Sequence, residues 1–314
     1  MTGVVRRPVL PSLVFSSRLY QALPRRATRN LSLTMALPRF SIVTGANKGI
    51  GLAITKALAA SPDATVVLAA RNPELGRAAV ESLSSSVAGR VVFHQLDVTS
   101  ASSIAGLAEA VAANAFGAGT ALDALICNAG WAAKGSAFTA DIARQSLAVN
   151  AWGVRDCSRA LLPSLRASAG GGQLVVVSST AGNLNNLAPD APQRARLAAT
   201  DLGQAELDRL GESFVDAVAS GDLKGWPRSA YGVSKMVATA QMRLLAREEA
   251  AAGSRVCVSA CCPGYVRTDM SSNKGHLTPE QGADTPVWLA SGGAGARTGE
   301  MWSKRKPMDF VNGW

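Results

Sequence analysis

The chain has 314 residues with 47% hydrophobic and 17% charged side chains, a composition that fits one large or two small domains with packed cores. No apolar run approaches the roughly 20 residues that a membrane-spanning helix needs, so we expect no membrane contact. The formal net charge of +10 comes mostly from the arginines of residues 1–34, which argues against the broad basic face of a nucleic-acid-binding domain.

Residues 1–34 differ in composition from the rest of the chain. They are rich in arginine, contain several serines and lack acidic residues, which is the composition of a transit peptide for a mitochondrion or a chloroplast. Met35, followed by Ala-Leu-Pro-Arg-Phe and the first predicted strand, also has the features of a complete cytosolic start. We predict either a transit peptide or a disordered or misassigned leader of a cytoplasmic protein, followed by one folded domain over residues 35–314.

From residue 40 onward, short β-branched runs alternate with Ala- and Leu-rich stretches of helical spacing. The alternation predicts βαβ units and therefore an α/β, doubly wound (Rossmann) domain with a mostly parallel sheet of about seven strands. The predicted strands cover residues 41–44, 65–69, 91–95, 124–127, 174–178 and 256–261, and the predicted helices include residues 75–83, 104–115, 142–165 and 231–249.

The stretch from about 183 to 225 interrupts this alternation. Within residues 205–220, Leu207, Phe214 and Val218 fall on one helical face. We predict an inserted helix between the fifth strand and the next long helix.

The sequence T-G-A-N-K-G-I-G, from Thr44 to Gly51, lies between the first strand and a helix. Gly45 would let the chain turn off the strand. Gly49 and Gly51 would let a pyrophosphate approach the backbone at the helix N-terminus, which favours anions. The spacing G-x-x-x-G-x-G differs from the commoner dinucleotide fingerprint, so a tight turn without a ligand stays an alternative.

Charged residues near the first three strand ends indicate the type of nucleotide. Lys48 lies within the glycine loop, and Arg71 follows the second strand, where a nucleotide without a 2′-phosphate would favour a carboxylate. Both positions favour NADP(H) over NAD(H). Asp97 ends the third strand, where it would accept a hydrogen bond from adenine, cap the next helix or stabilise a turn.

Tyr231 and Lys235 form a Y-x-x-x-K pair at the start of a long predicted helix. Residues four apart share a helix face, and a nearby ammonium group favours the phenolate, so we expect a lowered Tyr231 pKa and a role in proton transfer. Other polar motifs follow neighbouring strands and should therefore lie at the same edge of the sheet. These motifs are Asn128-Ala129-Gly130, Ser178-Ser179 and Pro263 to Thr268. Asn150 lies in the predicted helix between the fourth and fifth strands.

In this order and over residues 38–314, these motifs resemble those of the short-chain dehydrogenase/reductase family. Within it, residues 93–98, 225–232 and 260–270 resemble the monomeric NADPH-dependent carbonyl reductases. The long separation of Ser179 from Tyr231 agrees with this subgroup, whose members carry an extra helix between these two positions. That helix covers the surface through which other members of the family form dimers and tetramers. The resemblance therefore implies a monomer.

The resemblance also implies roles for individual residues. Tyr231 would donate a proton to a substrate carbonyl, and Ser179 would hydrogen-bond the same oxygen. Lys235 would bind the nicotinamide ribose and lower the pKa of Tyr231, and Asn150 would hold a water that links Lys235 to solvent. The residues expected to contact NADPH are Gly45, Asn47, Lys48, Gly49, Ile50, Gly51, Arg71, Asp97, Val98, Asn128, Ala129, Gly130, Tyr231, Lys235, Pro263, Gly264, Val266 and Thr268.

We therefore expect NADPH-dependent reduction of a small-molecule ketone, aldehyde or quinone to an alcohol, without a metal or a nucleic acid partner. Two alternatives stay open: NADP-dependent oxidation of a specific secondary alcohol, and a catalytically idle NADP(H)-binding sensor. The odd number of cysteines, five, without a C-x-x-C pair, predicts reduced thiols, and Cys261 and Cys262 near the expected site are either reactive or simply buried. Tyr265 stands where carbonyl reductases often carry tryptophan, which would alter the substrate pocket.

Overall fold

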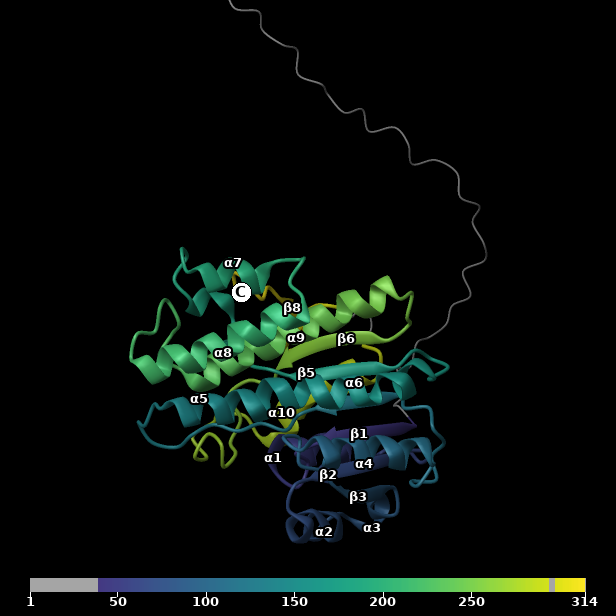
Figure 1. The fold of residues 1–314 in the computed structure, drawn as a ribbon. Coiled ribbons are helices and arrows are strands. Elements are labelled where there is room, and N and C mark those ends of the chain that lie inside the picture. Colours follow the sequence, from purple (N-terminus) through teal and green to yellow (C-terminus); the bar gives the residue numbers. More distant parts are fainter. Residues whose placement is uncertain (1–38, 294–296, 314) are drawn as a thin grey trace, which may run out of the picture. The chain divides into compact units, whose positions relative to one another are not determined.

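A computed structural model of the chain describes residues 39–293 and 297–313, and the predicted leader at residues 1–34 lies outside them (Figure 1). The strands are β1 (Phe40–Thr44), β2 (Thr65–Ala70), β3 (Val91–Gln95), β4 (Ala124–Cys127), β5 (Gln173–Val177), β6 (Cys257–Cys262), β7 (Met301–Ser303) and β8 (Lys306–Met308). The α-helices are α1 (Gly49–Leu58), α2 (Pro73–Glu81), α3 (Ser85–Ala88), α4 (Ala101–Ala112), α5 (Ala140–Leu147), α6 (Gly153–Arg166), α7 (Pro192–Ala198), α8 (Gln204–Ser220), α9 (Ala230–Ala251) and α10 (Pro279–Ala290).

The strands form one eight-stranded sheet in the order β3-β2-β1-β4-β5-β6-β7-β8. All neighbouring pairs are parallel except β7 and β8, which form a short antiparallel hairpin. The predicted doubly wound, mostly parallel sheet is therefore confirmed. Successive strands proceed in opposite directions from the junction of β1 and β4, and in such sheets ligands bind beyond the carboxyl ends of the strands at this switch point.

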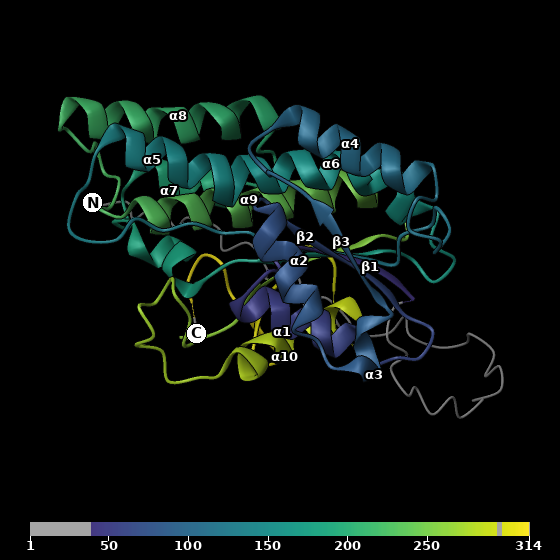
Figure 2. The ribbon, with the colours of Figure 1, turned by 90° about the horizontal axis from the view of Figure 1, so that it is seen from below.

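Helices cover both faces of the sheet, as Figure 2 shows. On one face α1, α2 and α10 contribute to a core that includes Val43, Val66 and Ile126. The alternate strand residues, such as Ile42 and Leu125, pack against α4, α5, α6, α8 and α9 on the other face. Burial on both faces explains why these strands are continuous apolar runs instead of alternating ones.

The predicted helix over residues 142–165 is interrupted. Helix α5 ends at Leu147, a five-residue π-helical turn η1 (Ala148–Trp152) follows, and α6 starts at Gly153. Such turns insert one residue into a helix and are frequent at functional sites. This turn contains Asn150.

A 3₁₀ turn, η2 (Thr180–Gly182), directly precedes the insertion, which then holds a second 3₁₀ turn, η3 (Leu184–Asn186), followed by α7 and α8. Helix α8 confirms the predicted inserted helix, whereas α7 was not predicted. Helix α8 packs against α5 and α9. Its Phe214 is fully buried, with ring centroids 6.2 Å from Phe138 and 5.6 Å from Trp226.

Polar contacts fix α8 on the body of the domain. Arg155 Nη1 of α6 donates to Asp208 Oδ1 of α8 at 2.9 Å, and Gln204 exchanges 2.9 Å hydrogen bonds with Gln241 of α9. Over the described residues, no helix is long and apolar enough to cross a membrane.

Candidate active site

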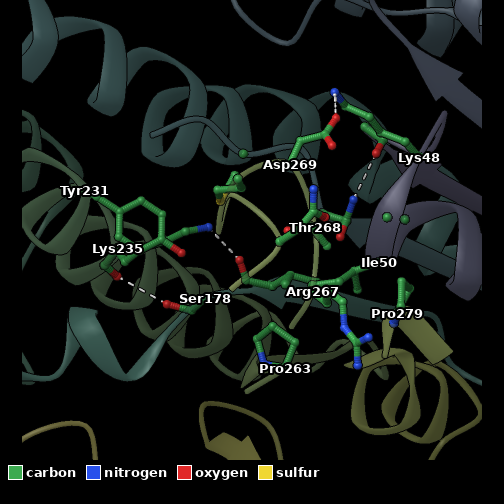
Figure 3. A pocket seen from close by; sticks show the side chains of 18 residues that line it. Lys48, Ile50, Ser178, Tyr231, Lys235, Pro263, Arg267, Thr268, Asp269 and Pro279 are labelled. Carbon is green, nitrogen blue, oxygen red and sulfur yellow. Dashed lines mark hydrogen bonds and ion pairs between the residues drawn. The ribbon is translucent and has the colours of Figure 1, made fainter. Parts of the chain in front are cut away.

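A cleft of about 330 Å³ lies at the carboxyl ends of the central strands (Figure 3). The glycine loop after β1, the residues after β4 and β5, the start of α9 and the loop after β6 all contribute to it. Its lining residues are Gly45, Lys48, Gly49, Ile50, Gly51, Asn128, Gly130, Val177, Ser178, Tyr231, Lys235, Pro263, Arg267, Thr268, Asp269, Met270, Asn273 and Pro279.

At Gly45 and Gly51 the glycine loop leaves no room for a side chain. Gly45 has a φ of 62°, and a Cβ there would lie 2.7 Å from Ala129 Cα. A Cβ on Gly51 would lie 2.5 Å from both Asn128 Nδ2 and the Gly45 carbonyl oxygen. These glycines therefore bring the strand, the helix and the residues after β4 into contact, and the backbone of the loop faces the cleft.

Asn128 holds this loop in place. Its Nδ2 donates to the carbonyl oxygens of Thr44 at 2.9 Å and Gly45 at 3.1 Å. The Thr44 hydroxyl accepts from the backbone N–H groups of Asn128 and Ala129, both at 3.0 Å. The loop is thus positioned before any ligand binds.

The N-terminus of α1 points into the cleft without a side-chain cap. Its N-cap residue, Lys48, makes no side-chain hydrogen bond to the helix, and the first turn contains no acidic residue. Uncapped N–H groups at a helix start bind anions such as phosphate. The cleft therefore fits the pyrophosphate of a dinucleotide.

The charged residues predicted near the adenosine have different surroundings. Lys48 Nζ forms a 2.7 Å ion pair with Asp269 Oδ2. Arg71 is exposed directly after β2, and none of the ion pairs among the described residues includes it. Asp97 Oδ1 accepts from the backbone and hydroxyl of Thr99 at 2.9 and 2.7 Å, which makes Asp97 the predicted turn aspartate. The N-cap of α4 is Ser100, so the helix-capping role for Asp97 was wrong.

Tyr231 and Lys235 lie in the first turns of α9, where they line the cleft together. The ammonium of Lys235 is 5.8 Å from the centroid of the Tyr231 ring and donates to the Val177 carbonyl at 2.7 Å. Burial lowers the pKa of Lys235 to about 8. Burial also raises the pKa of Tyr231 to about 12, although its interaction with the Ser179 hydroxyl acts in the opposite direction.

The expected lowering of the Tyr231 pKa is therefore wrong for this structure. Burial is the largest effect on the phenol, and the Lys235 ammonium is directed to a backbone carbonyl. A phenol with a raised pKa stays protonated at neutral pH, so the Tyr231 hydroxyl carries a proton that it could donate.

The two serines after β5 have distinct environments. Ser178 is buried, and its hydroxyl lies 2.7 Å from that of Thr239 in α9. Ser179 is partly exposed, and its hydroxyl accepts from the Ala181 backbone at 3.2 Å and interacts with Tyr231. Although Ser178 lines the cleft, the hydroxyl that approaches the phenol belongs to Ser179.

Asn150 is fully buried within the π-helical turn. Its side chain accepts from the Trp131 backbone N–H at 2.7 Å and donates to the Trp131 carbonyl at 2.8 Å and to the Ser234 hydroxyl at 2.9 Å. The Ser234 hydroxyl in turn donates to the Tyr231 carbonyl at 2.8 Å. Asn150 thus links the loop after β4 to the helix that carries Tyr231 and Lys235.

The loop after β6 covers the cleft from the side opposite the glycine loop. Val266 is buried and forms a bridge with Leu277. A Cβ on Gly49 would lie 3.1 Å from the Thr268 methyl group, so the two loops approach closely. At Gly264, with a φ of 85°, a Cβ would lie 2.5 Å from Leu277 Cδ1, which explains the glycine there.

The cleft brings together most, but not all, of the predicted site. Predicted residues that do not line it are Asn47, Arg71, Asp97, Val98, Ala129, Asn150, Ser179, Gly264 and Val266. Lining residues that were not among the predicted contacts are Val177, Ser178, Arg267, Asp269, Met270, Asn273 and Pro279. Of these, Ser178 and Arg267 belong to motifs that were expected at this sheet edge. Arg267, Asp269 and Met270 stand within the segment of residues 260–270 used for the resemblance, whereas nothing in the sequence singled out Asn273. All five cysteines are free thiols, and both Cys261 and Cys262 are buried.

Comparisons with known proteins agree with this site. The model of the short chain dehydrogenase family matches residues 39–189. Carbonyl reductase [NADPH] 1 of Mus musculus is 39% identical over 259 residues, which are 80% of this chain and 90% of the relative. Carbonyl reductase [NADPH] 3 of Rattus norvegicus is 39% identical over 261 residues, with the same coverage.

Two solved structures have the same fold. Salutaridine reductase from Papaver somniferum superimposes with a TM-score of 0.74 at 29% identity, covering 84% of this chain and 99% of its own. Menthone neomenthol reductase from Mentha piperita gives a TM-score of 0.72 at 26% identity, covering 86% and 100%.

The fold, the site and these relatives together define an oxidoreductase with a doubly wound nucleotide-binding domain. The chain belongs to the short-chain dehydrogenase/reductase family. Its relatives support NAD(P)-dependent carbonyl reduction as the general chemistry.

Proposed function

We propose that the protein reduces a ketone, aldehyde or quinone to an alcohol with NADPH, with Tyr231 as the proton donor. The observation that carries this proposal is the partly buried Tyr231 side chain, which lines the cleft together with Lys235, whose ammonium lies 5.8 Å from the centroid of the Tyr231 ring. The relatives named as NADPH carbonyl reductases support the same chemistry.

The residues of the cleft fit NADPH. Bound there, the nucleotide would supply a hydride to the carbonyl carbon. The backbone around Gly49 and Gly51 and the uncapped start of α1 would hold the pyrophosphate. Lys48 and Arg71 would hold the 2′-phosphate, which supports NADPH over NADH.

The protein's own residues would manage the proton. The Tyr231 hydroxyl would donate to the carbonyl oxygen as negative charge develops there, and the Ser179 hydroxyl would hydrogen-bond the same oxygen. The Lys235 ammonium would orient the ribose and stabilise the phenolate left after transfer. Asn150 would act through a water in proton resupply, although its side chain is already bonded to Trp131 and Ser234, so this role stays a prediction.

The substrate would be a small molecule and the protein a monomer. Helix α8 packs against α5 and α9 and is held there by the contact of Gln204 with Gln241. This placement supports a covered association surface. Light scattering coupled to size exclusion would give the mass of a single chain, and a dimer mass would contradict this part of the proposal.

One assay tests the chemistry. The loss of NADPH absorbance is followed with a panel of quinones, diketones and aldehydes, with NADH in parallel. We expect turnover that prefers NADPH, and a Tyr231→Phe variant that loses about 10²–10⁴-fold in kcat, the contribution of a positioned general acid. The variant should bind NADPH like the native protein, which separates lost chemistry from lost folding. Full activity in Tyr231→Phe would refute the assigned role, and NADPH binding without any turnover would favour the sensor alternative.

A further inference from the structure

The two walls of the cleft are joined by an ion pair. Lys48 belongs to the glycine loop and Asp269 to the loop after β6, 221 residues further along the chain. Their side chains meet with a distance of 2.7 Å between Nζ and Oδ2, and both residues line the cleft. Figure 3 shows this pair at one end of the cleft and Tyr231 with Lys235 at the other end.

The ion pair of Lys48 and Asp269 lies on the side of the cleft that would hold the adenosine half of the nucleotide. The reactive nicotinamide must lie near Tyr231, so the phosphates and the adenosine extend toward the glycine loop. Lys48 is therefore on the adenosine side of the cleft, where the proposed function assigns it to the 2′-phosphate.

The loop after β6 does not need the Asp269 carboxylate for its shape. The Arg267 backbone N–H donates to the Leu277 carbonyl at 2.8 Å, and the Ser271 hydroxyl donates to the Val266 carbonyl at 2.8 Å. Asp269 itself uses its backbone carbonyl to accept from Ser272. The carboxylate is left to interact with Lys48.

The pair is also suited to exchange. The side chains of Lys48 and Asp269 are 64% and 61% exposed, and such solvent-exposed ion pairs are weak. The hydrogen bond and charge of Lys48, with a smaller contribution from Lys134, lower the pKa of Asp269, so its carboxylate is ionised at neutral pH. A phosphate dianion would compete successfully with one carboxylate for Lys48.

We propose that Asp269 tunes cofactor affinity: it holds Lys48 before the nucleotide binds and releases it to the 2′-phosphate of NADP(H). The inference rests on the proposed use of NADPH. Asp269 acts through Lys48 and is therefore a positioning residue. By competing for Lys48 it weakens NADP(H) binding and speeds its release, whereas NADH, which carries a 2′-hydroxyl, leaves the ion pair intact.

The test measures nucleotide binding to the full chain and does not depend on turnover. Dissociation constants for NADPH and NADH are determined by nucleotide fluorescence for the native protein and for Asp269→Asn. We expect NADPH to bind about two- to fivefold more tightly to the variant and to dissociate more slowly, the effect of removing one exposed ion pair, with NADH unchanged. In a Lys48→Gln background, Asp269→Asn should have no effect on either nucleotide.

A matched control removes the same charge elsewhere. Asp141 forms an exposed ion pair with Arg144 at 3.1 Å and does not line the cleft. Asp141→Asn should leave both dissociation constants unchanged. If Asp141→Asn instead changed them as Asp269→Asn does, the effect would come from the net charge of the protein and not from the ion pair.

Several outcomes would overturn the exchange: weaker NADPH binding in Asp269→Asn, an equal change for NADPH and NADH, or no change. Equal weakening of both nucleotides would mean that the pair fastens the cleft over any nucleotide. A different result would contradict the proposed use of NADPH itself: a native protein that binds NADH as tightly as NADPH.

Discussion

Gly51 offers a direct test of how the glycine loop is built. In the structure a Cβ at this position would lie 2.5 Å from Asn128 Nδ2, 2.5 Å from the Gly45 carbonyl oxygen and 2.8 Å from Ala46 Cα. Two of these three atoms are backbone, so the clash cannot be relieved by rotating a side chain. In Gly51→Ala, either α1 must move away from the loop or Asn128 must give up its hydrogen bonds to Thr44 and Gly45.

The magnitude follows from these contacts. Inserting one carbon into a packed site costs about 1–3 kcal/mol. A lost Asn128 hydrogen bond adds about 1 kcal/mol. Because Gly51 lies in α1, the higher helix propensity of alanine offsets about 0.5–1 kcal/mol of this cost. We therefore expect Gly51→Ala to lower the free energy of unfolding by about 1–3 kcal/mol. Displacement of the loop should also weaken NADPH binding about tenfold, the equivalent of about 1.4 kcal/mol.

The assay is urea denaturation followed by circular dichroism, together with NADPH titration. Gly106 provides the matched control, because it lies inside α4 and a Cβ there would meet nothing within 4 Å. Gly106→Ala should raise the free energy of unfolding by about 0.5–1 kcal/mol through helix propensity and leave NADPH binding unchanged. If Gly51→Ala is as stable as the native protein and binds NADPH equally well, the close approach does not shape the cofactor cradle.

Three further predictions concern buried polar groups. Ser234→Ala leaves a buried Asn150 N–H without its partner, so urea denaturation should show a loss of about 1–3 kcal/mol in the free energy of unfolding, and kcat should fall. An unchanged stability and kcat in Ser234→Ala would contradict this role of the hydrogen bond. Lys235, with a pKa of about 8, is charged below that pH, so kcat/KM for NADPH should fall as the pH rises through about 8. Two results would contradict this assignment: a kcat/KM that does not change around pH 8, or a fall at the same pH in Lys235→Met. Glu249 is buried and hydrogen-bonded by Arg166, which lowers its pKa, so its stabilising effect is present above the unfolded-state pKa of about 4.3 and is lost in acid. Glu249→Gln should cost about 1–3 kcal/mol at neutral pH and less in acid, and an equal cost at both pH values, measured by urea denaturation, would count against this account.

The main strands and the glycine loop could be predicted because their signals are local. Strands β1 to β6 are β-branched runs of four to six residues, and their observed ends lie within one residue of the prediction. Strands β7 and β8 have three residues each, too few for a periodic pattern. Helix α10 was missed although Thr278 and Gln281 form a capping box at its start, a signal that was available in the sequence.

Features that depend on distant contacts could not be predicted. The spacing of Tyr231 and Lys235 shows that they share a helix face, but the direction of the Tyr231 pKa depends on burial, which arises only when α9 packs onto the sheet. The pairing of Lys48 with Asp269 joins residues from opposite ends of the domain. The π-helical turn covers only five residues between two α-helices, too few to show a period of their own, so the interruption at residues 148–152 could not be predicted.

That turn makes the length of this segment more critical than its composition. The π-helical turn accommodates one extra residue, and each residue of a helix changes the direction of its side chain by about 100°. Deleting one residue from Ala148–Trp152 would leave a regular helix, but α5 and α6 would no longer present their faces to α8 and the sheet at the same time. For protein engineering, and for variation among natural relatives, substitutions in this turn other than at Asn150 should be tolerated more easily than any single-codon insertion or deletion.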